Sequence, residues 1–228
     1  MTALLPNPSH PSPFRLLTPL LALLALPAAA QETPLPETAP KATGFAVGAR
    51  LAYGIARGDA FKQSPMAGHT DAVIAPQVDL SYFFTPRLAL NLQGQYGIGQ
   101  YSGSATEDTR RGSVLRLGLG LSYHALSDSN GSPWVGAGVG LERLKTTTDD
   151  QAGRLIATAT GFELLNLQAG IDFKLFDVVR VGPYFSGSAG RFLRATLERN
   201  GQELRSGSIE QKTVHFWFQP GVRVQVRL

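Results

Sequence analysis

The chain has 228 residues, which is enough for one large β-domain or two small ones. It contains no cysteine, and this excludes a disulfide framework, thiol catalysis and thiolate metal sites. The formal net charge of +4 comes from cations that are scattered along the sequence, so neither composition nor charge patterning favours a nucleic-acid-binding protein.

The first 30 residues have the organisation of a secretory signal peptide. Arg15 precedes an apolar run from Leu16 to Leu26, and Ala28-Ala29-Ala30 fits the small-residue pattern of a cleavage site. The run is too short for a transmembrane anchor. We therefore predict a signal peptide over 1–30 and a flexible, proline-containing linker over 31–43.

From Gly44 onward, eight segments alternate apolar and polar side chains with a period of two. The clearest is VLRLGLGLSY at 114–123, in which four leucines alternate with an arginine, two glycines and a serine. This alternation predicts extended strands with one apolar and one polar face. In chain order the predicted strands are 44–56, 73–84, 88–99, 114–123, 133–143, 161–173, 181–191 and 213–228, and 181–191 has the weakest pattern.

The connections between these strands alternate in length. Long polar connections are predicted at 57–72, 100–113, 144–160 and 192–212, and short links lie between them. Long loops at one rim and tight turns at the other are typical of bacterial outer-membrane barrels, in which the loops are extracellular and the turns periplasmic. This layout places both ends of the barrel domain in the periplasm.

The last long connection contains a second hairpin signal, the pair Asn200-Gly201, which is favoured in type I′ turns. Pairing outward from this turn predicts that Leu197 lies opposite Leu204. Extended along the same two strands, the register predicts that Phe185 lies opposite Phe216.

Three prolines, Pro76, Pro183 and Pro220, lie inside predicted strands. Proline has no backbone N–H and cannot donate to the ladder of hydrogen bonds between strands. In a closed barrel no strand has a free edge, so we predict a β-bulge at each of these prolines.

Two kinds of eight-stranded barrel fit the alternation. In a soluble, lipocalin-like barrel the apolar side chains fill the interior, whereas in a transmembrane barrel they face lipid and the lumen is polar. The polar faces here are rich in Gly, Gln, Asn and Ser, which favours a narrow lumen. Aromatic residues gather near strand ends, where the interfacial girdles of membrane barrels lie. They are Phe45, Tyr53, Tyr82, Phe84, Tyr96, Tyr123, Trp134, Phe162, Phe173, Phe216 and Phe218.

With its signal peptide, its eight strands and its terminal amphipathic strand at 213–228, the sequence resembles the small outer-membrane barrels of the OmpW-like, OmpX-like and OmpA-transmembrane-domain-like families. The resemblance covers 44–228. It implies an all-β fold, an eight-stranded antiparallel up-and-down transmembrane β-barrel in the bacterial outer membrane. It also implies a monomer without cofactors that contacts outer-membrane lipid and lipopolysaccharide and is inserted by the barrel-assembly machinery.

Charged residues on the polar faces are candidate site residues, because they would lie in the lumen. Counting from the predicted turns places Arg116 opposite Glu142 and Arg50 near Asp79, and Arg223 of the last strand can join them. Such pairs could gate a narrow pore or form structural salt bridges that plug the lumen. Eight strands leave little room inside, so the plug is favoured.

The sequence predicts no catalytic residues and no metal site. His69, His124 and His215 are not spaced as metal ligands. His124 and Ser127 are close in sequence, but they fall at the predicted periplasmic rim and no general-base partner is evident.

Three arginines in the predicted outer loops, Arg110, Arg111 and Arg199, are candidate contacts for lipopolysaccharide phosphates. The leading function is therefore that of a non-enzymatic outer-membrane protein with a structural or surface-interaction role. One alternative is a narrow channel for small or apolar solutes. The other is a soluble, lipocalin-like binder.

Overall fold

The computed structural model describes residues 43–66, 69–70, 72–100, 109–126, 129–151 and 153–228. The predicted signal peptide and all but the last residue of the predicted linker lie outside the described residues. Among the described residues, no helix is long and apolar enough to cross a membrane.

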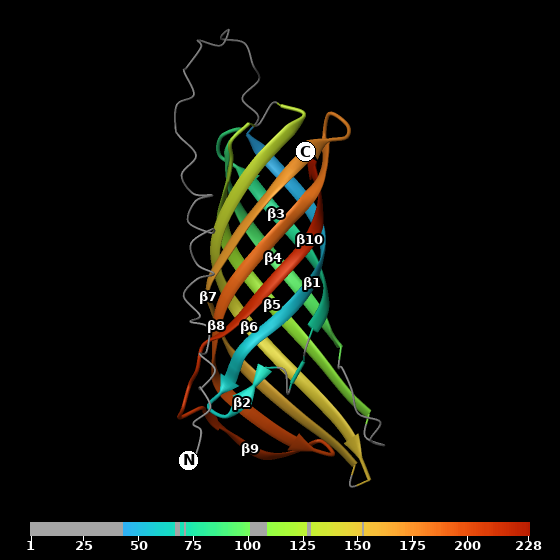
Figure 1. Ribbon diagram of the computed structural model, residues 1–228, viewed down its shortest axis with the longest axis vertical. Helices are drawn as coiled ribbons and strands as arrows, with labels where there is room; N and C mark the ends of the chain where they lie inside the picture. Colours follow the sequence, from blue (N-terminus) through green and yellow to red (C-terminus); the bar gives the residue numbers. More distant parts are fainter. Residues whose placement is uncertain (1–42, 67–68, 71, 101–108, 127–128, 152) are drawn as a thin grey trace, which may run out of the picture. The chain divides into compact units, whose positions relative to one another are not determined.

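Eight strands form a closed antiparallel ring in which each strand pairs with its neighbours in the chain (Figure 1). The ring closes where the last strand pairs with the first. These strands are β1 (Gly44–Phe61), β3 (Ala72–Phe83), β4 (Leu88–Gln100), β5 (Thr109–His124), β6 (Gly131–Asp150), β7 (Gly153–Lys174), β8 (Val179–Arg199) and β10 (His215–Arg227). Two short strands extend the wall: β2 (Ser64–Pro65) pairs with β1, and β9 (Gln202–Ser208) pairs with β8. The predicted eight-stranded up-and-down barrel is confirmed.

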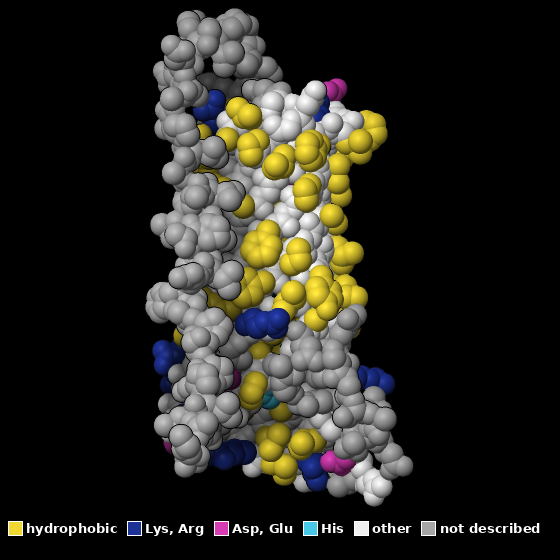
Figure 2. Space-filling model, viewed as in Figure 1, with side chains coloured by type: hydrophobic (Ala, Val, Ile, Leu, Met, Phe, Trp, Pro, Cys, Tyr) yellow, Lys and Arg dark blue, Asp and Glu magenta, His cyan; other side chains and the backbone are white. Residues whose placement is uncertain are grey.

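The apolar faces of the strands point outward. In β5, Leu117, Leu119 and Leu121 are each about half exposed, whereas Arg116, on the opposite face of the same strand, is only 5 % exposed. Figure 2 shows these hydrophobic side chains spread over the upper and middle parts of the wall on the face in view. A soluble protein would bury these side chains, so the lipocalin-like alternative is wrong and the leucines face lipid.

The two rims differ. The short connections at 84–87 and 175–178, with the described residues 125–126 and 129–130, share one rim with Gly44 and Leu228. The backbone N–H of Leu228 donates to the carbonyl of Phe45 at 2.9 Å. β2, β9 and the β6–β7 hairpin project from the opposite rim (Figure 1). Because outer-membrane barrels have short periplasmic turns and long extracellular loops, the second rim is the extracellular one.

Several strands are much longer than predicted. β6, β7 and β8 have 20, 22 and 21 residues, so most of the predicted loop at 144–160 is a regular hairpin that extends beyond the lipid belt. Apart from Leu144, Thr146 and Ala159, its described side chains are partly or fully exposed on both faces, so the apolar–polar alternation fades, although its threonines and other β-branched residues favour strands. The weakly patterned segment 181–191 also belongs to one of the longest strands. It lies inside the ring, where buried and exposed positions alternate, and its glycines, serines and proline weaken the apolar pattern.

Both predicted pairings near the last hairpin are wrong. Leu197 lies opposite Arg205, because a register shift between Leu197 and Glu198 displaces β9 by one residue. Phe216 lies opposite Ala189, because β10 is a separate strand that begins at His215 and does not continue the register of β9.

The predicted bulges at the three prolines are also wrong. Register shifts in the ring occur at Gly138/Gly140, Thr160/Gly161 and Glu163/Leu165 instead. Each proline is paired with one neighbouring strand only, and the ladder on its other side omits that position without changing register. One missing donor is therefore tolerated locally. The pairs are Pro76 with Leu51, Pro183 with Val222 and Pro220 with Phe185.

One predicted girdle residue, Trp134, lies inside the barrel and is only 2 % exposed. It shares the inward face of β6 with Gly136 and Gly138, which have no side chains to compete for the space. At the same rim, the outward ring of Tyr82 contacts those of Phe45 and Phe84, with centroids 5.0 and 5.2 Å apart. These three residues form part of an interfacial girdle.

Candidate functional site

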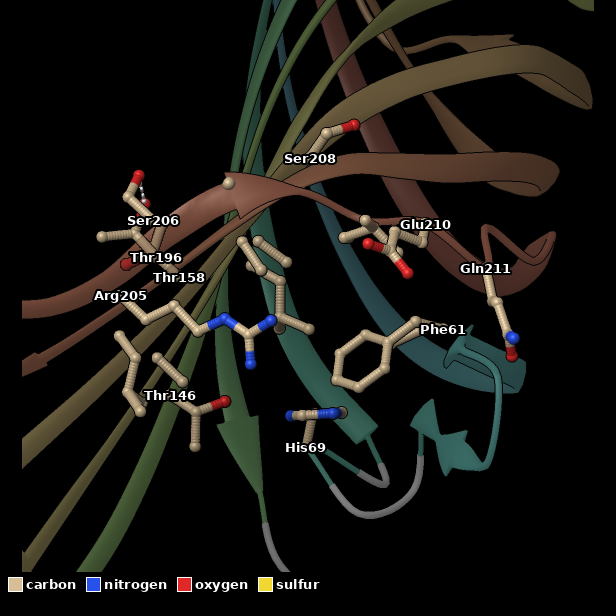
Figure 3. Close-up of a pocket in the computed structure, with 18 of the residues that line it drawn as sticks. Phe61, His69, Thr146, Thr158, Thr196, Arg205, Ser206, Ser208, Glu210 and Gln211 are labelled. Carbon is tan, nitrogen blue, oxygen red and sulfur yellow. Dashed lines mark hydrogen bonds between the residues drawn. The ribbon is translucent and has the colours of Figure 1, made fainter.

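A cavity of about 870 Å³ lies at the extracellular end of the barrel (Figure 3). It is bounded by the ends of β1, β6, β7 and β8, by β9 and by the segment that follows β9. Leu144 and Ala159 belong to the buried apolar cluster below the cavity, and Phe61 and Ile209 pack against this cluster. The cavity is therefore a cup with an apolar base.

Below the cup, the lumen is filled. A layer of amides crosses its middle, in which Gln95 donates to Oε1 of Gln77 at 3.0 Å and Gln219 donates to Oε1 of Gln95 at 3.1 Å. The space left within this layer is about 10 Å³, close to the volume that one water molecule needs. Side chains therefore fill the lumen at this level.

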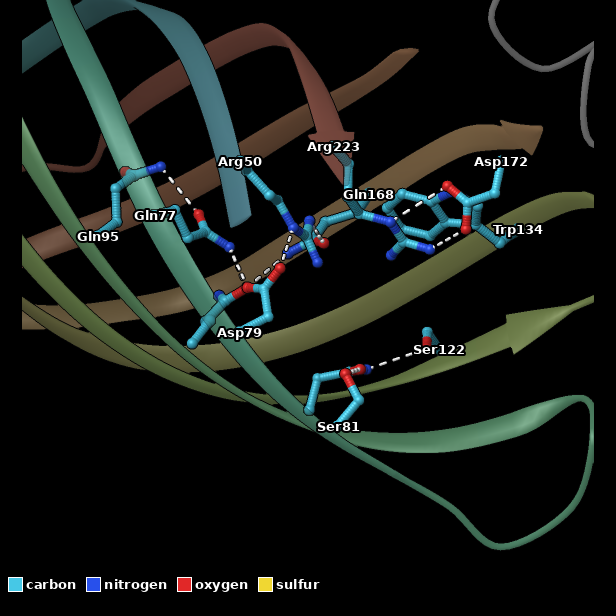
Figure 4. Close-up of polar contacts among 12 residues, drawn as sticks. Arg50, Gln77, Asp79, Ser81, Gln95, Ser122, Trp134, Gln168, Asp172 and Arg223 are labelled. Atoms are coloured by element: carbon cyan, nitrogen blue, oxygen red, sulfur yellow. Dashed lines mark hydrogen bonds and ion pairs between the residues drawn. The ribbon is translucent and has the colours of Figure 1, made fainter. Parts of the chain in front are cut away.

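An ion pair lies on the periplasmic side of the amide layer (Figure 4). Arg50 of β1 pairs with Asp79 of β3, and its Nη1 donates to Oε1 of Gln168 at 2.6 Å. The Nε2 of Gln77 donates to Oδ1 of Asp79 at 2.7 Å, so the amide layer also holds this pair. The structure thus brings together two of the predicted site residues.

Arg223 is the register partner of Arg50, so it joins the predicted pair, but its own ion pair is with another residue. It pairs across the lumen with Asp172 of β7, and its guanidinium lies 3.9 Å from the ring centroid of Trp134. The indole Nε1 of Trp134 donates to Oδ1 of the same carboxylate at 3.1 Å. Asp172 was on the polar face of its predicted strand, but nothing in the sequence indicated which arginine it would meet across the lumen.

A second charged cluster lies on the extracellular side of the amide layer, around Glu142. Arg116, which is its register partner on β5, approaches it to 3.6 Å and also lies 3.9 Å from Glu163. The other oxygen of Glu142 lies 2.9 Å from Nε2 of His215, and Trp217 Nε1 donates to Glu142 at 3.0 Å. Glu163, His215 and Trp217 were not predicted as site residues. The bulge after Glu163 obscures its register, and nothing in the sequence indicated that the side chains of His215 and Trp217 would meet Glu142 across the lumen.

The buried charges of the lumen are balanced in number. We call them, with the amide layer and the two buried tryptophans, the plug. Among the described residues, four arginines and four carboxylates are buried. These are Arg50, Arg116, Arg180 and Arg223, with Asp79, Glu142, Glu163 and Asp172. Paired and hydrogen-bonded charges can be held in a dry interior, whereas an unpaired charge there is very costly.

The predicted lipopolysaccharide contacts are not grouped. Arg111 is exposed on the outer wall of β5. Arg199 lies near the tip of the β8–β9 hairpin, with Nη2 at 3.5 Å from Oδ2 of Asp150. Arg110 belongs to β5, but the structure does not describe its side chain. Ser127 lies outside the described residues. Across the described part of the chain, no group of three or more His, Asp or Glu side chains could hold a metal ion.

Comparison with known proteins gives structural matches only: no family model and no curated protein matches the sequence. Neisserial surface protein A (NspA) superposes with a TM-score of 0.53 at 14 % identity, over 81 % of this chain and 97 % of that one. A major outer membrane protein from Thermus thermophilus gives a TM-score of 0.50 at 10 % identity, over 78 % and 99 % of the two chains. The protein is an outer-membrane β-barrel. At identities this low, the superpositions establish the fold alone. The outward apolar face of the barrel agrees with a location in the bacterial outer membrane.

Proposed function

We propose that the protein is a closed, non-enzymatic barrel that acts at the cell surface by binding, with the plug as a permanent structural element. The closed amide layer carries this proposal, because about 10 Å³ of free space cannot pass a solute. The plug also fits a structural role, since each of the pairs Arg50–Asp79 and Arg223–Asp172 is buried and further hydrogen-bonded.

Conductance tests this proposal against the narrow-channel alternative. The purified barrel is reconstituted into planar bilayers, and a general porin in the same bilayers serves as the positive control. We expect no discrete single-channel steps from the wild-type protein. Reproducible steps that depend on the amount of folded protein would establish a channel and overturn the proposal.

A second surface role is favoured by exposed cations just beyond the lipid belt. Arg57, Arg111, Arg143 and Arg191 are exposed and alternate with inward-facing residues, so they point away from the lumen at the extracellular end. Arg143 is the register partner of Leu115 at the edge of the belt. We propose that these arginines, together with the earlier candidates Arg110 and Arg199, contact lipopolysaccharide phosphates, which arginine binds well.

Lipopolysaccharide that copurifies with the protein measures this contact. The double variant Arg111→Gln/Arg143→Gln is compared with Arg87→Gln, whose exposed arginine lies in a turn at the periplasmic rim. We expect less bound lipopolysaccharide per barrel in the double variant and an unchanged amount in the control. Equal amounts in all three proteins would remove these two arginines from the contact.

We also propose that the barrel is a monomer inserted by the barrel-assembly machinery. Ring closure between β1 and β10 leaves the eight-stranded ring without an unpaired edge that could recruit a second copy.

A further inference from the structure

The extracellular cup has the size and lining of a small-molecule site. Its volume of about 870 Å³ falls within the range of ligand pockets, roughly 300–1,000 Å³. Its base is closed by the apolar cluster that contains Leu144 and Phe192, and the ring of Phe192 stacks on His215 at a centroid distance of 4.4 Å. A molecule in the cup would therefore stay there and would not pass into the lumen.

Two polar groups in the cup lack partners. Thr146 is 4 % exposed, and its Oγ1 has no hydrogen-bond partner among the described residues. Arg205 of β9 is the register partner of Leu197 and lines the cavity with an exposed side chain, and within the described part of the chain it forms no ion pair. Figure 3 shows the Arg205 guanidinium and the Thr146 side chain directed toward the same space. A buried hydroxyl without a hydrogen-bond partner lowers the stability of the fold, which points to a ligand that forms the missing hydrogen bond.

The charge of the lining favours an anion. Lys62 and Arg205 line the cavity together with Glu210, so with neutral histidine the net charge is +1. Phe61, Leu144 and Leu197 provide apolar surface in the same cavity. The lining therefore matches a small molecule that combines one negative group with an apolar body.

Resting on the proposed surface-binding function, we propose that the cup binds a small amphiphilic monoanion, a carboxylate or phosphate monoester on an apolar chain or ring. Arg205 holds the negative group, the hydroxyl of Thr146 hydrogen-bonds to it, and the apolar part packs on Phe61 and Leu144. Such a ligand has two sources, the surrounding membrane or the medium.

Binding of decanoate to the full barrel in lipid nanodiscs tests the site, with empty nanodiscs as the blank for partitioning into lipid. Decanol, of similar length and without charge, tests the role of the anion. Arg205→Gln removes the cation, and Thr146→Val removes the hydroxyl at nearly constant volume. Arg194→Gln is the matched control, because Arg194 is exposed on β8 and does not line the cup.

We expect saturable decanoate binding by the wild type and by Arg194→Gln. Arg205→Gln should lose at least about tenfold in affinity, since a hydrogen bond to a charged group contributes about 1.5–3 kcal/mol. Thr146→Val should lose severalfold, and decanol should bind at least about tenfold more weakly than decanoate. No saturable binding above empty nanodiscs, or equal binding by Arg205→Gln, would overturn the site.

Two further measurements separate the sources and the proposals. Organic extracts of barrels isolated from outer membranes are compared between the wild type and Arg205→Gln. An anion present only in the wild type shows a membrane source, whereas decanoate binding without such an anion shows supply from the medium. Conductance is measured separately. If the barrel shows no conductance steps and does not bind decanoate, only the cup proposal fails. If it conducts and binds decanoate, only the closed-barrel proposal fails.

Discussion

At the scale of single residues, the plug is held by carboxylates that each serve more than one donor. Asp172 accepts from both Arg223 and Trp134, and Glu142 accepts from Trp217 while lying close to Arg116 and His215. Removing such a carboxylate strands a guanidinium or an indole N–H in a dry interior. These residues should therefore dominate the stability of the barrel more than any single lipid-facing leucine.

We predict that Asp172→Ala destabilises the barrel by about 3–5 kcal/mol, the usual effect of leaving a buried charge unpaired. Asp172→Asn should cost less, because its amide oxygen can still accept from Trp134. Urea unfolding of the barrel in lipid vesicles measures both changes. The control is Asp177→Asn, in an exposed turn where Asp177 Oδ1 lies 2.8 Å from Nζ of Lys174. Exposed ion pairs contribute little to the free energy of unfolding. If Asp177→Asn lowered this free energy as much as Asp172→Ala does, the prediction would be refuted.

Residue-level prediction from sequence succeeded where charges lie on adjacent strands. Arg116 and Glu142 are register partners across a short turn, so counting from the turn was sufficient. The pair of Arg223 with Asp172 joins strands that are not neighbours in the ring. Strand periodicity gives the face of a residue but not the rotation of the barrel that decides which side chains meet across the lumen.

At the scale of strands, β5 and β6 approach each other closely along a row of glycines. Gly120 is the register partner of Gly138, and a Cβ on Gly120 would lie 2.6 Å from the carbonyl oxygen of Ala137. That oxygen belongs to the backbone and cannot move without shifting the strand. The glycines thus allow the tight wall of a narrow barrel.

We predict that Gly120→Ala destabilises the barrel by about 1–3 kcal/mol, as overpacking does. Gly187→Ala is the matched control, because the nearest atoms to its added Cβ are aromatic ring carbons of Phe185 and Phe218, both 4.0 Å away. This change should be neutral or slightly stabilising. The same unfolding assay compares the two variants, and equal losses would show that glycine is needed in these strands for a reason other than space.

The sequence predicted the number and order of the ring strands correctly but not their ends or their irregularities. The bulge between Glu163 and Leu165 leaves both Leu164 and Leu165 half exposed on the outer wall, which a strict period of two cannot produce. Beyond the lipid belt, strands have water on both sides and lose the pattern. Lipid imposes alternation on a strand, so alternation marks the part of a strand in contact with lipid better than its full length.

At the scale of the whole molecule, the plug is one continuous network. Arg116 Nη1 donates to Oε1 of Gln95 at 3.3 Å, and Gln95 leads through Gln77 to Asp79 and Arg50. The network therefore joins the extracellular cluster, the amide layer and the periplasmic cluster. If the barrel is closed as proposed, a solute would have to break all three layers to cross.

This continuity separates a plug from a gate. A gate opens when one charge is removed, whereas a layered plug stays closed because the other layers remain. We predict that Glu142→Gln, which removes the charge but keeps the size of the side chain, shows no single-channel conductance steps in planar bilayers. Asp79→Asn, on the other side of the amide layer, should also stay silent. Heat-dependent mobility on gels confirms that each variant is folded before it is tested. Discrete conductance steps in the folded Glu142→Gln barrel, absent from the wild type, would make the extracellular cluster a gate and the lumen a closed channel.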